Sequence, residues 1–255
     1  MGVLSESKIK LLVRALPQHG VVTRSTLASL GITPQHTQKY VAGGWLESIG
    51  AGVFKRAGDT PTWQAALSAL QAQDGLAVHV AGLTALAAEG TGQFARLGRE
   101  TVWLFSRPGI RPPLWFRNYR WPVQVRHVTS KFLPESVAVR SYDFGGFPLL
   151  ASASERAILE CLFLAPARMD LVEVFGLLES QRTLRPKVMQ SLLEECSSVK
   201  VKRLFMFMAE RAALPVFAKL DQQRIGLGRG TRSLVPKGAY VAKYELVVPR
   251  ALVSG

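Results

Sequence analysis

A short segment near the N-terminus carries side chains that could read DNA. These side chains are Gln35, His36, Gln38 and Lys39. Glutamine can pair with adenine, and lysine with guanine, at the base edges exposed in the major groove. Lys55 and Arg56 end a glycine-rich stretch shortly afterwards and could reach an adjacent phosphate backbone or the minor groove. These residue types predict contacts with double-stranded DNA.

The flanking sequence predicts two helices that would hold these side chains. Thr23 can cap a helix over residues 24–30. Thr33 followed by Pro34 starts a second helix over residues 34–42, because a hydroxyl cap and a proline at the first helical position both favour a helix start. Glutamine and lysine side chains of the second helix lie away from its inward stripe when residues are spaced by 100°. That helix is therefore the predicted base reader.

A hairpin follows, with strands expected over 45–49 and 53–56. Together with a helix expected over 5–17, this predicts a winged helix-turn-helix domain spanning residues 1–58. The N-terminus of the helix over residues 24–30 would rest on phosphates through Arg24, Ser25 and Thr26. These contacts would fix the register of the protein on the DNA. The alternative is a protein-docking module whose polar helix face is merely solvated.

The charge of the chain favours a polyanionic partner. Its 255 residues hold 32 lysines and arginines against 18 acidic residues, which gives a formal net charge of +14. Basicity of this size points to nucleic acid as the commonest partner. The basic residues are spread over the chain, so part of this charge can also be ordinary solvated surface.

Residues 59–255 are expected to form a larger mixed α/β domain, which makes the fold class α+β. Strands are expected over 101–105, 123–128, 137–142 and 244–248. Helix starts are indicated by a Ser152-x-x-Glu155 capping box, by Asp170-x-x-Glu173, by Pro186 and by an apolar-basic run over 199–211.

Two basic clusters in this domain could face a partner. Lys200, Lys202 and Arg203 gather at the start of the 199–211 helix, where positive charge opposes the helix dipole and is not explained by local stability. Arg229 and Arg232 lie in a glycine-rich segment further along. We expect these five residues to form a partner-facing surface, on charge clustering alone.

An aromatic-basic stretch over 106–121 allows two interpretations. Basic residues mixed with aromatic rings can form a stacking surface for nucleic acid. Alternatively, the aromatic rings tuck under the sheet while the arginines extend into solvent. The second interpretation is favoured.

No motif indicates catalysis. The segment GLGRG over 226–230 lacks the pattern of a phosphate-binding loop, and a helix is not expected after it. Cys161 and Cys196 lie in apolar helical patterns as buried thiols, and the histidines are scattered, so no metal site and no cofactor are expected. His79 is more typical of a satisfied core histidine than of a catalyst. The chain is expected not to be an enzyme.

The hydropathy of the chain bears on its location. No apolar run approaches the roughly 18–20 residues that a membrane helix needs. The first residues lack the hydrophobic region of a secretory signal. A cytoplasmic protein without a membrane partner is expected.

The chain resembles the AbiEi antitoxins of type IV toxin–antitoxin systems, which act in bacterial abortive infection and so in phage defence. The motifs that carry the resemblance are YVAGGWLESIGAGVFKR, GLAVHVAGLTAL, SERAILECL, CSSVKVKRLFMFMAE and IGLGRGTRSLVPKGAYVAKYELVVP. The resemblance implies that the winged domain binds repeats near its own promoter and represses the operon. It also implies that the larger domain neutralises a cognate AbiEii toxin, a nucleotidyltransferase-like protein, without depending on a stable complex. The five basic residues of the two clusters are then the predicted antitoxic surface.

Two other functions stay open on the sequence. One is a transcription regulator whose larger domain senses a ligand. The other is a nucleic-acid enzyme targeted by a winged helix, against which the lack of a carboxylate cluster in the basic regions counts.

Overall fold

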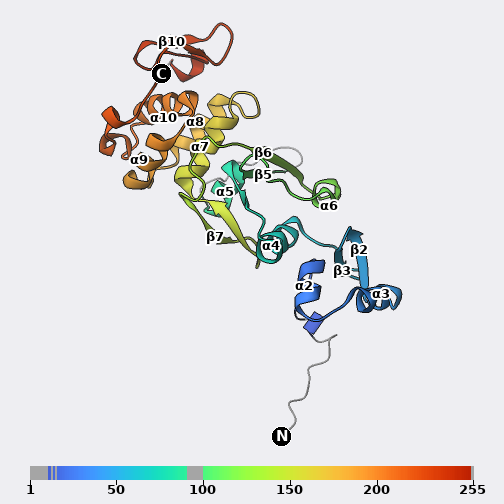
Figure 1. Cartoon of the computed structure of the whole chain (residues 1–255). Coiled ribbons are helices and arrows are strands. Elements are labelled where there is room, and N and C mark those ends of the chain that lie inside the picture. The colour runs from blue at the N-terminus through green and yellow to red at the C-terminus, as the bar shows by residue number, and fades with distance from the viewer. Residues whose placement is uncertain (1–10, 13, 15, 91–99, 254–255) are drawn as a thin grey trace.

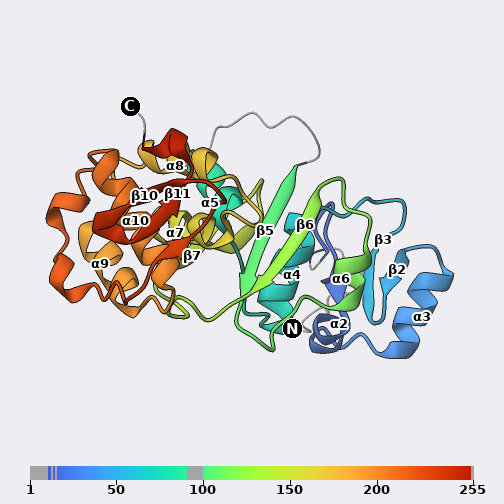
Figure 2. The same cartoon turned by 90° about the horizontal axis from the view of Figure 1, so that it is seen from above.

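The structure is a computed structural model of the whole chain, shown in Figure 1, and it describes residues 11–12, 14, 16–90 and 100–253. The helix expected over 5–17 lies largely outside these residues. Both views place a small winged part at one end of the molecule and the C-terminal strands at the other (Figures 1 and 2). No described helix has the length and apolar character needed to cross a membrane.

The N-terminal part is a winged helix-turn-helix. Its elements are β1 (Val22–Thr23), α2 (Arg24–Ser29), α3 (Pro34–Ala42), β2 (Leu46–Gly50) and β3 (Val53–Arg56). The strands form an antiparallel sheet in the order β1-β3-β2. A small core of Leu12, Leu16, Val22, Leu27, Ile32 and Leu46 joins helices and sheet. The expected helix, strand and turn order is confirmed for the described residues.

A five-stranded mixed sheet forms the centre of the larger part, in the order β6-β5-β4-β8-β7. These strands are β4 (Val78–Val80), β5 (Thr101–Ser106), β6 (Gln124–Thr129), β7 (Val139–Asp143) and β8 (Pro148–Ser152). β4 runs parallel to β8 and antiparallel to β5, while β5 and β6 are parallel. The strands expected over 101–105, 123–128 and 137–142 are confirmed within a few residues.

Helices surround this sheet and build a second layer beyond it (Figure 2). They are α4 (Trp63–Asp74), α5 (Gly82–Ala88), α6 (Leu114–Asn118), α7 (Ser154–Leu164), α8 (Leu171–Glu179), α9 (Pro186–Glu195) and α10 (Val199–Arg211). α7 lies at the centre of the layer and packs against α5, α8, α9 and α10. Nearly every side chain of α7 is buried as a result.

The helix-start predictions have mixed outcomes. Asp170 caps α8 by accepting hydrogen bonds from the amides of Val172 and Glu173, as expected, and Pro186 begins α9. The Ser152-x-x-Glu155 capping box is wrong. Helix α7 begins at Ser154, and its N-cap residue is Ala153, whose methyl group cannot accept a hydrogen bond. The Ser152 hydroxyl instead donates to Glu160, and Glu155 accepts from Arg185.

The chain ends in a small sheet of β9 (Arg232–Ser233), β10 (Ala239–Val241) and β11 (Leu246–Val248), in the order β10-β11-β9. The strand expected over 244–248 is shorter than predicted, because Ala242–Tyr244 form a 3₁₀ turn and Glu245 adopts a left-handed backbone conformation. This sheet packs beside α10 at the far end from the winged part (Figure 1).

Candidate nucleic-acid interface

Helix α3 presents a free polar face. The side chains of Gln35, Gln38 and Lys39 are exposed, and within the described residues none of them makes a hydrogen bond or ion pair. Thr33 holds the helix start by accepting from the amide of His36, and the buried Thr37 hydroxyl donates to the carbonyl of Thr33 at 3.1 Å. A rigid helix with three unused polar side chains suits hydrogen bonding to base edges.

His36 has a different place from its three neighbours. Its Nδ1 lies 2.9 Å from the Thr33 hydroxyl and accepts from the Thr33 amide at 3.4 Å, so the ring completes a capping box. The side chain is half-buried. The structure therefore gives His36 a structural role at the helix start, in addition to the predicted DNA contact.

At the N-terminus of α2, the three predicted phosphate contacts differ. Arg24 is exposed, and its amide donates to the carbonyl of Gly52 in the wing turn at 2.7 Å. The Ser25 hydroxyl instead donates to the Asp74 carboxylate at 2.6 Å, which fastens α2 to the end of α4. Thr26 is half-buried. A carboxylate beside Ser25 repels phosphate, so Arg24 is the one of the three best placed to meet DNA.

The two basic residues of the wing, which the sequence predicts to contact DNA, both have partners within the protein. Lys55 pairs with Glu47 and donates to the carbonyl of Asp59 at 2.7 Å, and only 14% of its side chain is exposed. The hydrogen bond from Lys55 lowers the pKa of the Glu47 carboxyl. Arg56 is exposed but donates to the carbonyl of Leu16 at 3.0 Å. Both cations therefore fix the hairpin to its surroundings.

The aromatic residues of the 106–121 stretch are tucked into the protein, as favoured. Phe116 and Trp121 are buried, and the Trp121 indole donates to the carbonyl of Phe116 at 2.8 Å. Trp115 and Tyr119 are half-buried against the core. The basic residues Arg111, Arg117 and Arg120 are exposed. A base-stacking platform is therefore absent from this stretch.

At the start of α10, Lys202 and Arg203 are buried and Lys200 is half-buried, whereas the sequence predicted that all three face a partner. Arg203 is 1% exposed and Lys202 8% exposed. The Lys200 ammonium is half-buried and donates to the carbonyls of Phe163 and Ala165, at 2.7 and 2.5 Å, near the end of α7. Burial lowers the pKa of Lys200 to about 8.

Arg203 holds the glycine-rich loop in place. Its guanidinium donates to the carbonyls of Leu227 and Gly230, both at 2.7 Å, and pairs with Glu245 at 2.7 Å. Gly228 and Gly230 have positive φ values of 65° and 79°, which glycine adopts at low cost. Strand β9 follows this loop, so the geometry of a phosphate-binding loop and helix is absent here. Arg229 and Arg232 are exposed.

A buried polar network joins α7 to the central sheet. Of its residues, the sequence predicted a buried position only for His79. The Glu160 carboxylate accepts from His79 at 2.9 Å, Arg156 at 2.9 Å, Ser152 at 2.8 Å and the Gly82 amide at 3.0 Å. His79 is thus a satisfied core histidine, as expected. Burial alone would raise the pKa of Glu160, but the charge and hydrogen bond of His79, then the charge of Arg156, outweigh it and lower that pKa.

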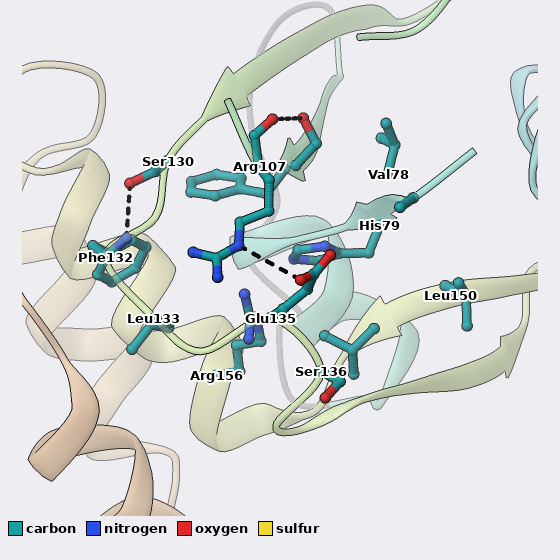
Figure 3. A pocket seen from close by; sticks show the side chains of 14 residues that line it. Val78, His79, Arg107, Ser130, Phe132, Leu133, Glu135, Ser136, Leu150 and Arg156 are labelled. Carbon is teal, nitrogen blue, oxygen red and sulfur yellow. Dashed lines mark hydrogen bonds and ion pairs between the residues drawn. The ribbon is translucent and has the colours of Figure 1, made fainter. Parts of the chain in front are cut away.

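A cavity of about 240 Å³ opens beside this network, at the start of β4 and the ends of β5 and β6 (Figure 3). Its walls combine apolar side chains such as Phe105 and Leu133 with the polar heads of Arg156 and His79. Arg107 and Glu135 form an ion pair of 3.8 Å at this cavity. Within the described residues, no three His, Cys, Asp or Glu side chains come together to hold a metal ion.

Two family models match the chain. The model described as "Transcriptional regulator, AbiEi antitoxin N-terminal domain" matches residues 5–97. The model described as "Transcriptional regulator, AbiEi antitoxin, Type IV TA system" matches residues 99–249. The two matched regions follow one another along the chain and together include the motifs that carry the resemblance.

Among solved structures, the chain is similar to the crystal structure of the RV2827C protein from Mycobacterium tuberculosis. The two share 15% sequence identity with a TM-score of 0.59, over 96% of this chain and 92% of the other. At that identity the likeness concerns the fold. No individually curated protein matches the chain. The family matches together span the winged part, the central sheet and the helical layer, and the chain belongs to the AbiEi antitoxin family of transcriptional regulators from type IV toxin–antitoxin systems.

Proposed function

We propose that this antitoxin represses its own operon by binding promoter repeats through residues 1–58, and that it does so without enzymatic activity. The observation that carries the proposal is the free polar face of α3, where Gln35, Gln38 and Lys39 are exposed and unpaired within the described residues. Arg24 at the start of α2 adds a cation for the phosphate backbone. The net charge of +14 favours association with DNA of any sequence.

The direct test is titration of the protein onto its own upstream DNA and onto a scrambled duplex of equal length. A preference for the upstream DNA that persists as salt is raised supports base reading, because the phosphate contribution falls steeply with salt while base contacts discriminate. Equal and salt-sensitive binding to both duplexes would contradict sequence-specific repression and leave charge alone as the cause.

Single substitutions should separate base contacts from backbone contacts. Lys39→Ala and Gln35→Ala are expected to reduce discrimination between the two duplexes, by about 1–3 kcal/mol for a bidentate base contact. Arg24→Ala should weaken both duplexes alike and reduce the slope of log affinity against log salt by about one. Unchanged discrimination in both α3 variants would refute base reading by this helix.

We further propose that residues 59–255 neutralise a cognate AbiEii-like nucleotidyltransferase toxin without a stable complex, acting in the cytoplasm. Of the five basic residues assigned to the antitoxic surface, the exposed Arg229 and Arg232 are the accessible ones. The sheet of β9, β10 and β11, which contains Arg232, lies at the opposite end of the molecule from α3 (Figures 1 and 2). Repression and neutralisation are therefore expected to be separable.

Co-expression with the toxin from an unrelated promoter tests that separation. The variant with Gln35→Ala and Lys39→Ala should protect cells as well as the unchanged protein does, since the larger domain is intact. Arg229→Gln combined with Arg232→Gln should reduce protection while leaving operator binding unaltered. Full protection by this second variant would rule out the assignment of Arg229 and Arg232 to the antitoxic surface.

The cavity of Figure 3 favours a second candidate function, a transcription regulator that senses a ligand. Its size of about 240 Å³ suits only a small molecule. The co-expression experiment distinguishes the two functions, because a plain regulator would give no protection against the toxin.

A further inference from the structure

The turn of the wing packs against α6 of the larger part, so the two parts meet there. A Cβ atom added to Gly50 would lie 2.3 Å from the Cβ atom of Trp115, which means that the Gly50 backbone touches this indole side chain. Real Cβ atoms essentially never approach so closely, and any side chain at position 50 would push α6 away. Glycine at this position is therefore required for the contact.

The wing brings no free basic side chain to this contact. Lys55 and Arg56 are its cations, and they are hydrogen-bonded to Asp59 and Leu16 on the protein side. A groove of about 560 Å³ lies between the wing turn and α6. Its α6 side provides Asn118 and Arg120, both exposed and without a hydrogen bond or ion pair within the described residues. The α6 segment, residues 113–120, thus places two side chains with unused hydrogen-bond donors beside the wing turn.

Arg24 brings a further cation to the same wing turn. Arg24 packs on the wing turn, since its Nε would lie 3.3 Å from a Cβ atom added to Gly52. Together with Gln38, it also lines a second groove of about 550 Å³ between α2, α3 and the wing. Arg120 thus lines the groove at the wing turn, and Arg24, which packs on the same turn, lines the groove that also contains Gln38.

We propose that the α6 segment is a second DNA contact, in which Arg120 and Asn118 bind the phosphodiester backbone of the duplex that α3 reads. This inference rests on the proposed DNA-binding function and adds the contact that the wing does not supply. A guanidinium and an amide are both phosphate donors, and neither carries sequence information at the backbone. The contact also makes the larger domain part of the DNA-binding unit.

The first test is titration of Arg120→Gln onto the upstream and scrambled duplexes over a series of salt concentrations. We expect the affinity for both to fall about five- to tenfold at 0.1 M salt, and the slope of log affinity against log salt to shrink by about one. The preference for the upstream duplex should be unchanged. Lys187→Gln removes one exposed charge from α9, far from the wing, and serves as the matched control.

A second variant displaces α6 without changing the charge. Gly50→Ala should lower the affinity for both duplexes and reduce the salt slope in the same direction as Arg120→Gln. Gly176→Ala in α8 is the control, because a Cβ atom there meets nothing within 4 Å. Far-ultraviolet circular dichroism establishes whether each variant is folded. If Gly50→Ala is not folded, the affinity of Asn118→Ala for the two duplexes provides an independent test of the contact.

The outcomes separate this inference from the proposed function. If Arg120→Gln keeps the unchanged salt slope and Asn118→Ala keeps the unchanged affinity, while Arg24→Ala reduces the slope, the α6 contact is refuted and DNA binding by the winged part stands. If Arg120→Gln abolishes toxin neutralisation but leaves DNA binding intact, the segment faces a protein and the inference is overturned. If the unchanged protein binds neither duplex, the proposed function and the inference fall together.

Discussion

Glu160→Gln is expected to lower the free energy of unfolding by about 3–5 kcal/mol, because it removes the counter-charge of a buried ion pair. Arg156 is 6% exposed and has Glu160 as its ion-pair partner at 2.9 Å. The carboxylate also accepts from the Gly82 amide and the Ser152 hydroxyl. A glutamine amide has one oxygen in place of two, so some of these donors lose their acceptor. Urea unfolding followed by tryptophan fluorescence measures the loss.

The loss should depend on pH. The pKa of Glu160 in the folded protein lies below the ordinary value of 4.5, so its contribution to stability is present above pH 4.5 and is lost as the pH falls through the folded pKa. The difference between the unchanged protein and Glu160→Gln should therefore be full at pH 7 and should shrink in acid. A difference that stays constant down to pH 3 would contradict the charged network.

A surface pair provides the matched control for the same substitution chemistry. Glu194 pairs with Arg224 at 2.8 Å, and 63% of the Arg224 side chain is exposed. Glu194→Gln is expected to cost less than about 1 kcal/mol, since exposed ion pairs contribute little. If Glu194→Gln and Glu160→Gln cost the same, the burial argument for Glu160 is wrong.

The winged part could be predicted from sequence because its signals are local. Thr33 and Pro34 start α3, and Gly43 with Gly44 ends it, so the helix and its polar face follow from neighbouring residues. What the sequence could not show is which polar atoms are already engaged. The partners of Ser25, Lys55 and Arg56 lie four to 49 positions away, and only the fold brings them together.

The larger part was harder to predict because its pairings are distant. Strand β8 pairs in parallel with β4, although some 70 residues separate Val80 from Ala151, and it begins with a proline. The network around Glu160 had one usable signal. Arg156 and Glu160 stand four residues apart in a helix that is apolar between them and beyond them, and such a pair can neutralise itself in a core. His79 and Ser152 come from other segments and carried no such signal.

The start of α10 shows how charge clustering misleads. Lys202 and Arg203 follow one another in a helix that is covered on several sides, so both side chains are buried whatever their charge. The glycine-rich loop over 226–230 supplies carbonyl groups to Arg203, and that partner cannot be identified from charge alone. A cluster of cations thus indicates a partner surface only where the chain leaves it exposed.

Arg203→Met is expected to destabilise the protein by about 3–5 kcal/mol, because it leaves several buried acceptors without a donor. The carbonyls of Leu227 and Gly230 would lose their hydrogen bonds, and Glu245 would lose its ion pair. The damage should centre on β9–β11, since Arg203 joins the loop before β9 to the turn before β11. Hydrogen exchange of amides over 226–248 should accelerate more than exchange in α3.

Lys202→Met is the matched control, one position earlier in the same helix. Lys202 is also buried, yet it has no hydrogen bond or ion pair within the described residues. Removing a buried charge without a partner should leave stability unchanged or raise it. Equal destabilisation by Lys202→Met and Arg203→Met would mean that shape, rather than the hydrogen bonds of Arg203, holds the loop.

The same variants decide how the basic residues serve toxin neutralisation. If Arg203 acts by holding the loop, Arg203→Met should protect cells less, in proportion to the fraction of the variant that is unfolded. Growth at a lower temperature should then restore part of the protection. Arg229→Gln with Arg232→Gln should lose protection at every temperature, because both side chains are exposed and are assigned to the antitoxic surface itself. Protection that Arg203→Met loses without any loss of stability would instead place its guanidinium in the antitoxic contact itself, and the burial argument would fail.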